Sequence, residues 1–260
     1  MFDWITALQG LVLMLGLGFL TWLASLLKQD VSIVDSVWSL FFFGVALLYF
    51  FNAQPNGPRS VWVLALVGLW AVRLCAYLTW RNWGKPEDRR YQAIRSRNQP
   101  NFPVKSLWLV FFLQALLAWV VALPILPALK SGLDLGPLDG MGIVVILFGL
   151  GFESLADWQM AVFKAKPENQ GRVMDRGLWG YSRHPNYFGE FSLWWGVYLL
   201  AISAGAPVWV LVSPLLMSFL LLKVSGIPLL ENDLQAHRPA YRDYQNRTSA
   251  FFPSLPKKAR

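Results

Sequence analysis

The sequence predicts an all-α integral membrane protein, a single domain over residues 1–260 that forms a bundle of seven transmembrane helices. The chain is 260 residues long and 55% hydrophobic, with a mean hydropathy of +0.41, which is too apolar for a soluble domain. Its apolar residues also come in runs close to the ~20 residues that a helix needs to cross the hydrocarbon core of a bilayer. The predicted spans, in order, are 4–27, 33–51, 60–80, 106–126, 140–163, 187–204 and 206–222.

The length of the first apolar run and the positions of charged residues in the later runs fit membrane spans. The first run is too long for the core of a signal peptide and has no positive residue before it, so we expect it to remain as an anchor. The second, third, fifth and sixth spans each carry acidic or basic side chains toward one end, whereas the fourth and seventh carry none. The last two spans follow one another almost directly.

Lysine and arginine alternate strongly between the connections. Of 23 such residues, 20 fall on one side: Lys28, Arg81, Lys85, Arg89, Arg90, Arg95, Arg97, Lys105, Lys164, Lys166, Arg172, Arg176, Arg183, Lys223, Arg238, Arg242, Arg247, Lys257, Lys258 and Arg260. The other side has Arg59 and Lys130, and Arg73 lies within the third span. The positive-inside rule then places the amino terminus outside and the carboxyl tail in the cytoplasm.

Composition also excludes several classes of protein. The formal charge of +8 is explained by topology and by contact with anionic membrane lipids, so no nucleic-acid partner is expected. Gly149 and Gly151 lie inside a predicted membrane helix without a preceding strand, which excludes a dinucleotide-binding fingerprint of the Rossmann type. Cys75 is expected to serve packing, and the two histidines, His184 and His237, give little support for a metal site.

Five ionisable side chains lie within the predicted spans: Asp35, Arg73, Glu153, Asp157 and Glu190. A charge at the centre of a membrane helix costs roughly 2.5–3.5 kcal/mol on insertion scales, so each is expected to face the bundle interior beside a partner. The predicted topology brings all five toward the cytoplasmic face. We therefore expect them to converge on one cavity, with simple interhelical salt bridges as the alternative.

Helical spacing aligns some of these residues with polar neighbours. Arg73, Tyr77 and Arg81 follow one another at intervals of four and form one stripe along the third span. Glu153 and Asp157, also four apart, begin a comparable stripe that continues to Lys164.

Three local segments carry further information. Residues 81–91 mix cations with aromatic rings, which suits either phosphate and base binding or an ordinary interfacial belt. Residues 171–190 interrupt the helix with glycine and proline and then begin the sixth span, where capping explains some residues but not Arg183, His184 and Glu190 together. The acidic segment 231–233 either closes a site from the tail or merely solvates the start of the tail.

The segment Arg183-His-Pro-Asn-Tyr-Phe-Gly-Glu190, preceded by Gly177-Leu-Trp-Gly-Tyr181, resembles the steroid 5-alpha-reductase family and its bacterial relatives. Residues 77–91, Asp157 and the closing Tyr241-Arg-Asp-Tyr244 support the resemblance over about two thirds of the chain. The Arg-His-Pro core also resembles membrane methyltransferases that use S-adenosylmethionine.

The reductase resemblance implies an enzyme that binds NADPH in a cytoplasm-facing cavity and reduces the C=C bond of a 3-oxo-delta-4 steroid or a similar lipophilic enone. It implies that Tyr77 hydrogen-bonds the substrate carbonyl, with Asp35 as the candidate acidic partner of that phenol. The residues expected to hold the cofactor are Arg81, Asn82, Arg89, Arg90, Tyr91, Asp157, Lys164, Arg172, Tyr181, Arg183, His184, Asn186, Glu190 and Asn232. No metal and no obligatory protein partner are expected.

Two further interpretations stay open from the sequence. A lipid or prenyl-cysteine methyltransferase of the same membrane fold would bind S-adenosylmethionine instead of NADPH. A non-enzymatic membrane protein or transporter would need neither cofactor. For the reductase, we expect location in a bacterial inner membrane with the active site facing the cytoplasm.

Overall fold

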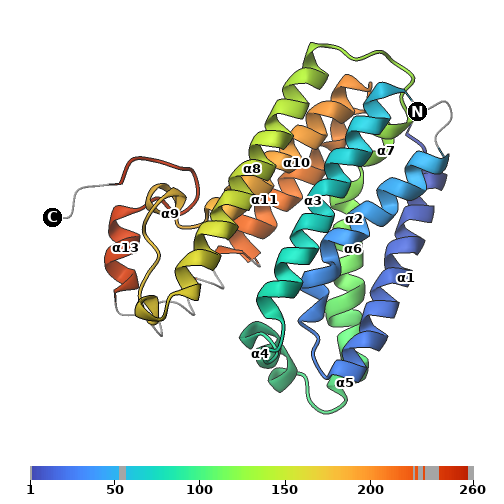
Figure 1. Ribbon diagram of the computed structural model, residues 1–260. Coiled ribbons are helices and arrows are strands. Elements are labelled where there is room, and N and C mark those ends of the chain that lie inside the picture. Colours follow the sequence, from blue (N-terminus) through green and yellow to red (C-terminus); the bar gives the residue numbers. More distant parts are fainter. Residues whose placement is uncertain (1, 53–56, 225, 228–230, 232–239, 257–260) are drawn as a thin grey trace. The chain divides into compact units, whose positions relative to one another are not determined.

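The computed structural model describes residues 2–52, 57–224, 226–227, 231 and 240–256. Within this part of the chain the regular structure is helical throughout and contains no strand (Figure 1). The all-α prediction is therefore confirmed for the described residues.

Five helical segments are long and apolar enough to cross a membrane, which confirms the first five predicted spans as helices and indicates a membrane protein. Their bounds are α1 (Trp4–Lys28), α2 (Ile33–Asn52), α3 (Pro58–Asn82), the run Phe102–Ala122 and α8 (Pro137–Ala165). The run Phe102–Ala122 comprises α5 (Phe102–Ser106), the π-helical η1 (Leu107–Phe112) and α6 (Leu113–Ala122).

The fourth span differs from its predicted bounds of 106–126. Helix α6 ends at Ala122, and a separate helix, α7 (Ile125–Lys130), follows after Pro124. Proline has no backbone N–H to donate and its ring clashes with the carbonyl group four residues earlier, so the break falls where the sequence places Pro124.

The remaining two predicted spans are helical but are not among the five. Helix α10 (Pro185–Ser203) begins with polar residues, and the apolar segment Val208–Val224 is shorter. That segment is built from η3 (Val208–Leu211), α11 (Val212–Phe219) and η4 (Leu220–Val224). The count of seven spans and the orientation of the chain stay predictions.

The chain forms two compact units. Unit 1 contains Met1–Met141 and Val197–Ser213, and unit 2 contains Gly142–Gly196 and Pro214–Arg260. In unit 1, α2 packs against α1 and α3, and α1 packs against α6 (Figure 1). The short helix α4 (Arg89–Arg97) and α5 lie at the end of this bundle where α1 terminates.

The two cations on the predicted outer side, Arg59 and Lys130, are both paired with acids inside unit 1. Arg59 donates from Nε to Asp139 at 2.7 Å, and both side chains are only 1% exposed. Arg59 also donates to the carbonyl oxygens of Leu133 and Asp134. Lys130 pairs with Asp3, the residue that caps α1. Neither cation therefore adds unpaired positive charge to its end of the bundle.

Unit 2 adds shorter elements to the long helices. The loop after α8 contains η2 (Pro167–Asn169) and α9 (Leu178–Tyr181), and the carboxyl-terminal part contains α13 (Tyr241–Arg247). Residues Leu178 and Trp179 in α9 contact α8: Leu178 donates its backbone N–H to Gln159 at 3.0 Å, and the Trp179 indole donates to the Ala156 carbonyl oxygen at 3.0 Å.

Candidate functional site

A close crossing of α8 and α10 within unit 2 depends on three glycines: Gly149 on α8, and Gly189 and Gly196, seven residues apart, on α10. A Cβ on Gly149 would lie 2.5 Å from the Gly189 carbonyl oxygen, and one on Gly196 would lie 2.8 Å from the Gly142 carbonyl oxygen. Real Cβ atoms are not found at such distances, so the two backbones touch only because side chains are missing. Small residues at a helix crossing commonly permit this approach in membrane proteins.

The crossing places acidic residues of α8 beside the first turns of α10. A Cβ on Gly189 would lie 2.6 Å from the Glu153 backbone nitrogen, and Asn186 donates from its amide to Asp157 at 3.5 Å. Glu153, Asp157 and Glu190 are 2%, 5% and 9% exposed. Because the two helices run antiparallel, Glu153 and Asp157 of α8 lie opposite the first turns of α10, which carry Asn186 and Glu190. Convergence of all five ionisable residues on one cavity stays a prediction.

The polar groups at this crossing are rich in hydrogen-bond acceptors. Ionised carboxylates accept only, while the Asn186 amide both donates and accepts. Such a set suits a ligand that presents hydroxyl or amide N–H donors, or one that carries positive charge. These four residues form what we call the acid–amide cluster: Glu153, Asp157, Asn186 and Glu190.

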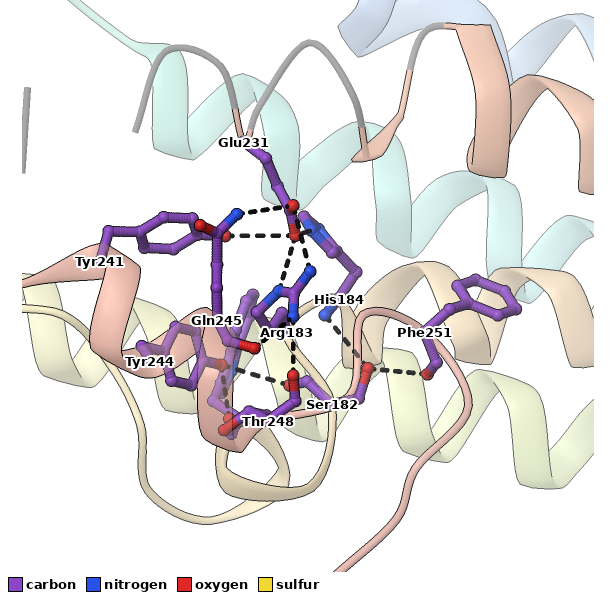
Figure 2. A network of polar contacts seen from close by, with 10 residues as sticks. Ser182, Arg183, His184, Glu231, Tyr241, Tyr244, Gln245, Thr248 and Phe251 are labelled. Atoms are coloured by element: carbon purple, nitrogen blue, oxygen red, sulfur yellow. Dashed lines mark hydrogen bonds and ion pairs between the residues drawn. The ribbon is translucent and has the colours of Figure 1, made fainter. Parts of the chain in front are cut away.

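The Arg-His-Pro segment makes a second polar network in unit 2, shown in Figure 2. Arg183 donates from Nε and Nη2 to the two oxygens of Glu231, at 2.7 and 3.1 Å. His184 Nε2 lies 3.0 Å from Glu231 Oε1, and Gln245 donates to the same carboxylate at 2.9 Å. Burial raises the pKa of Glu231, but hydrogen bonds from His184 and Arg183 outweigh this and lower it to about 2.

The same segment is also bonded to the carboxyl-terminal chain through its backbone. Arg183 donates its backbone N–H to the Ser249 carbonyl oxygen at 2.8 Å, and its Nη1 to the Thr248 carbonyl oxygen at 2.7 Å. Ser182 donates its hydroxyl to Phe251 at 2.7 Å (Figure 2). Residues 182–184 therefore hold the segment 241–251 in place, a role that the sequence did not indicate.

Glu231 is the residue that sequence reasoning left undecided. It belongs to the acidic segment 231–233, for which the sequence leaves two roles open, and its partners are 48 and 47 residues earlier in the chain. In the structure Glu231 contacts Arg183 and His184, and closure of a site by this segment stays a prediction. Asn232, predicted to bind cofactor, lies outside the described residues.

In unit 1 the predicted polar stripe of α3 is confirmed. The guanidinium carbons of Arg73 and Arg81 lie 5.9 and 5.8 Å from the centre of the Tyr77 ring, one from each side along the helix. Arg81 also donates to the Asn82 side chain at 3.1 Å. The Tyr77 ring therefore lies between two positive charges. Because Tyr77 is only half-buried, it retains partial access to its surroundings.

Asp35, the candidate acidic partner of Tyr77, is bonded to α4. It accepts from Arg90 Nη2 at 2.7 Å and from the Tyr91 hydroxyl at 2.5 Å. Burial and the neighbouring Asp35 carboxylate raise the pKa of the Tyr91 phenol well above its ordinary value. Tyr91 therefore stays protonated and gives its hydrogen to Asp35, while support of Tyr77 by Asp35 stays a prediction.

Internal bonding takes up several of the residues predicted to hold a cofactor. Arg90 and Tyr91 anchor α4 to the start of α2, and Arg183 and His184 anchor the carboxyl-terminal segment. Four other predicted residues present exposed side chains: Arg89, Lys164, Arg172 and Tyr181. These exposed residues and the acid–amide cluster are the part of the predicted set best placed to meet a ligand.

Other kinds of site find less support in the described residues. No group of three or more histidine, cysteine, aspartate or glutamate side chains in the described part of the chain is arranged to hold a metal ion.

A hollow of about 510 Å³ in unit 1 is lined by residues from separate parts of that unit's sequence, among them Asp3, Lys130 and Gly205. Its lining contains none of the residues predicted for the cofactor or the substrate.

Comparison with known proteins adds a family match. A family model described as "Protein of unknown function (DUF1295)" matches residues 21–248. An uncharacterized protein of Schizosaccharomyces pombe is 26% identical over 277 aligned positions, which cover 95% of this chain and 79% of the relative. No solved structure gives a significant match to the chain.

Proposed function

Because this chain, a member of the DUF1295 family, resembles the steroid 5-alpha-reductases over residues 177–190, we propose that it is a membrane reductase that uses NADPH to reduce the C=C bond of a lipophilic enone. A 3-oxo-delta-4 steroid is the substrate class that the resemblance favours. The observation that carries the proposal is the glycine-dependent crossing that sets Asp157 against Asn186, 3.5 Å apart, beside the buried Glu190. These are positions that the reductase resemblance assigns to the cofactor.

The residues present are chemically suited to NADPH. The carboxylates of Asp157 and Glu190 would accept hydrogen bonds from ribose hydroxyls, and the Asn186 amide would pair with a group that both donates and accepts, such as a carboxamide. Phosphates need cations, and guanidinium forks bind them in two-point fashion. Arg172 and Lys164, both exposed in unit 2, supply such cations.

When bound, NADPH supplies the hydride that adds to the β carbon of the enone. The contribution of the protein is to stabilise the negative charge that develops on the carbonyl oxygen. Tyr77 supports this role because its hydroxyl is a donor and its ring lies between the guanidinium groups of Arg73 and Arg81. One such donor in a dry site is typically worth about 3 kcal/mol of barrier, or roughly a hundredfold in rate. Water is the proposed source of the proton that completes the reduction.

The buried acids favour one second candidate, a methyltransferase that uses S-adenosylmethionine. The sulfonium of that cofactor is positively charged, and three carboxylates at one crossing would favour a cation. The exposed cations Lys164 and Arg172 of unit 2 favour the phosphate-bearing NADPH instead. The resemblance of residues 177–190 favours the reductase, and the two candidates make opposite predictions for binding.

Binding of the two cofactors to purified protein in detergent is the decisive experiment. We expect NADPH to bind with low-micromolar or better affinity and S-adenosylmethionine to show no measurable binding. Asn186→Ala should weaken the binding of NADPH at least tenfold. Asn246→Ala, which removes an exposed amide on α13, should leave this affinity unchanged. The opposite cofactor preference would transfer the proposal to the methyltransferase.

The proposed setting is a bacterial inner membrane with the cofactor arriving from the cytoplasm. The charge alternation along the sequence supports this orientation. A lipophilic substrate would then enter sideways from the bilayer. Accessibility labelling of a cysteine introduced at exposed Lys166, in a variant whose native Cys75 is replaced by alanine, would test the orientation in intact cells.

A further inference from the structure

The end of unit 1 where α1 terminates carries a patch of three cations and three apolar side chains. The cations Lys28, Arg97 and Lys105 are exposed. Leu27, Val104 and Trp108 are 88%, 61% and 63% exposed. We call these six residues the basic–apolar patch.

Three separate contacts bring the segments of this patch together. Arg95 of α4 donates to the Gln29 carbonyl oxygen, next to Lys28, at 3.3 Å. Lys105 donates to the Asn98 carbonyl oxygen, next to Arg97, at 3.1 Å. The patch is therefore a defined feature of the bundle end where α1, α4 and α5 meet (Figure 1).

A third contact fixes α5 on α1 from the inside. The Trp22 indole donates to the Pro103 carbonyl oxygen at 2.8 Å. Trp22 also packs against the buried cluster that contains Phe102 and Val110. The neighbouring Val104, Lys105 and Trp108 consequently face outward from a rigid base.

The acids of this region are used within the protein and leave the patch cations unneutralised. Glu87 accepts from Arg95 at 2.7 Å and from the Val31 backbone at 2.9 Å, and Asp30 accepts from Ser32. Burial raises the pKa of Glu87, but the hydrogen bond from Arg95 outweighs it and keeps that pKa below its ordinary value. Within the described ranges, no ion pair joins Lys28, Arg97 or Lys105 to an acid.

The chemistry of the partner follows from the two parts of the patch, its three cations and its three apolar side chains. The apolar half lies at the end of α1 and the start of the Phe102–Ala122 run, both apolar enough to cross a membrane. A partner must therefore offer hydrocarbon at that depth and negative charge just beyond it. We propose that the basic–apolar patch binds the headgroup of an anionic phospholipid, with the acyl chains against Leu27, Val104 and Trp108.

The test compares retained lipids by native mass spectrometry of delipidated protein in a neutral detergent. Phosphatidylglycerol and phosphatidylcholine with identical acyl chains are titrated into the wild type and into the variant K28Q/R97Q/K105Q. Each cation near an anionic lipid surface contributes about 1 kcal/mol. We therefore expect the variant to bind phosphatidylglycerol roughly a hundredfold more weakly at low salt, and the wild type to prefer it over phosphatidylcholine.

The matched control is K166Q/R176Q/R242Q, which removes three exposed cations from unit 2. This control should retain phosphatidylglycerol as the wild type does. An equal loss in both triple variants would show that net charge alone matters and would overturn the proposal. Equal retention of the two lipids by the wild type, or competition by soluble glycerol 3-phosphate, would overturn it as well.

The outcome does not depend on the proposed reductase activity. The patch shares no residue with the acid–amide cluster or with Tyr77, and lipid retention is read without a cofactor. Thermal midpoints of the two triple variants without added lipid confirm that both are folded.

Discussion

Arg183 and Glu231, 48 residues apart, are joined by two hydrogen bonds that tie the start of α10 to the carboxyl-terminal part of the chain (Figure 2). Each side chain is only 12% exposed. A carboxylate facing a guanidinium fork in this way combines charge with fixed geometry. The pair therefore gives the Arg-His-Pro segment a structural task in addition to any role toward a cofactor.

Replacing Glu231 by glutamine should loosen this connection. The variant removes the negative charge and leaves the Arg183 guanidinium partly buried without a countercharge, which typically costs about 3 kcal/mol. We expect a lower thermal midpoint in detergent and faster tryptic cleavage at Arg242 and Arg247. Glu168→Gln, which alters an exposed carboxylate on the loop after α8, is the control and should behave as wild type. Equal cleavage rates in both variants would contradict the proposed connection.

The same carboxylate predicts a dependence of stability on pH. The pKa of Glu231 falls from 4.5 to about 2 on folding, so its contribution is fully present above pH ~4.5 and is lost as the pH falls toward 2. The shift corresponds to about 3 kcal/mol. Thermal midpoints of the wild type should decline over this window more steeply than those of Glu231→Gln. Parallel curves would show that Glu231 is not the group responsible.

The glycine crossing of unit 2 predicts a sharp contrast between neighbouring positions. Gly149→Ala places a methyl group 2.5 Å from the Gly189 carbonyl oxygen, so α8 and α10 must separate. Gly151→Ala is the control, because a Cβ added at Gly151 would have no atom within 4 Å. Alanine also stabilises a helix by about 1 kcal/mol relative to glycine. We expect Gly149→Ala to lower the thermal midpoint and to weaken the binding of NADPH at least tenfold. Gly151→Ala should match or exceed the wild type in both measurements, and similar effects at the two sites would count against the crossing.

Tyr77→Phe should reduce turnover of an enone substrate roughly a hundredfold, because the lost hydroxyl stabilises charge only in the transition state. NADPH affinity should stay within twofold. Tyr49→Phe is a suitable control in the same unit, since the buried Tyr49 hydroxyl has no hydrogen-bond partner among the described residues. Steady-state kinetics and cofactor titration check both variants. Unchanged turnover in Tyr77→Phe would remove this phenol from the mechanism.

The buried pair of Arg59 and Asp139 should contribute much more to stability than the pair of Lys130 and Asp3. Arg59→Met leaves the Asp139 carboxylate buried at 1% exposure, which typically costs about 3–5 kcal/mol. Lys130→Met breaks a pair in which both partners are partly exposed, and such pairs contribute about 0–1 kcal/mol. Thermal unfolding in one detergent compares the two. A similar loss in both variants would be inconsistent with the difference in burial.

The sequence alone determined the helical class, five of the membrane-crossing segments and the local spacing of polar residues. These features depend on the length of apolar runs and on a helical repeat of 3.6 residues, both of which are local. The stripe of Arg73, Tyr77 and Arg81 follows directly from that repeat. So does the placement of Glu153 and Asp157 one turn apart.

Only the tertiary structure decided which distant residues meet. Asp35 is bonded to Tyr91 and Arg90, more than 50 residues later, and Arg183 is bonded to Glu231. Spacing within one helix carries no information about such pairs, because they depend on how loops return and on how closely backbones approach. The contact of Gly149 with Gly189 is the clearest case: each glycine is ordinary in the sequence, and only their meeting brings Asp157 to Asn186.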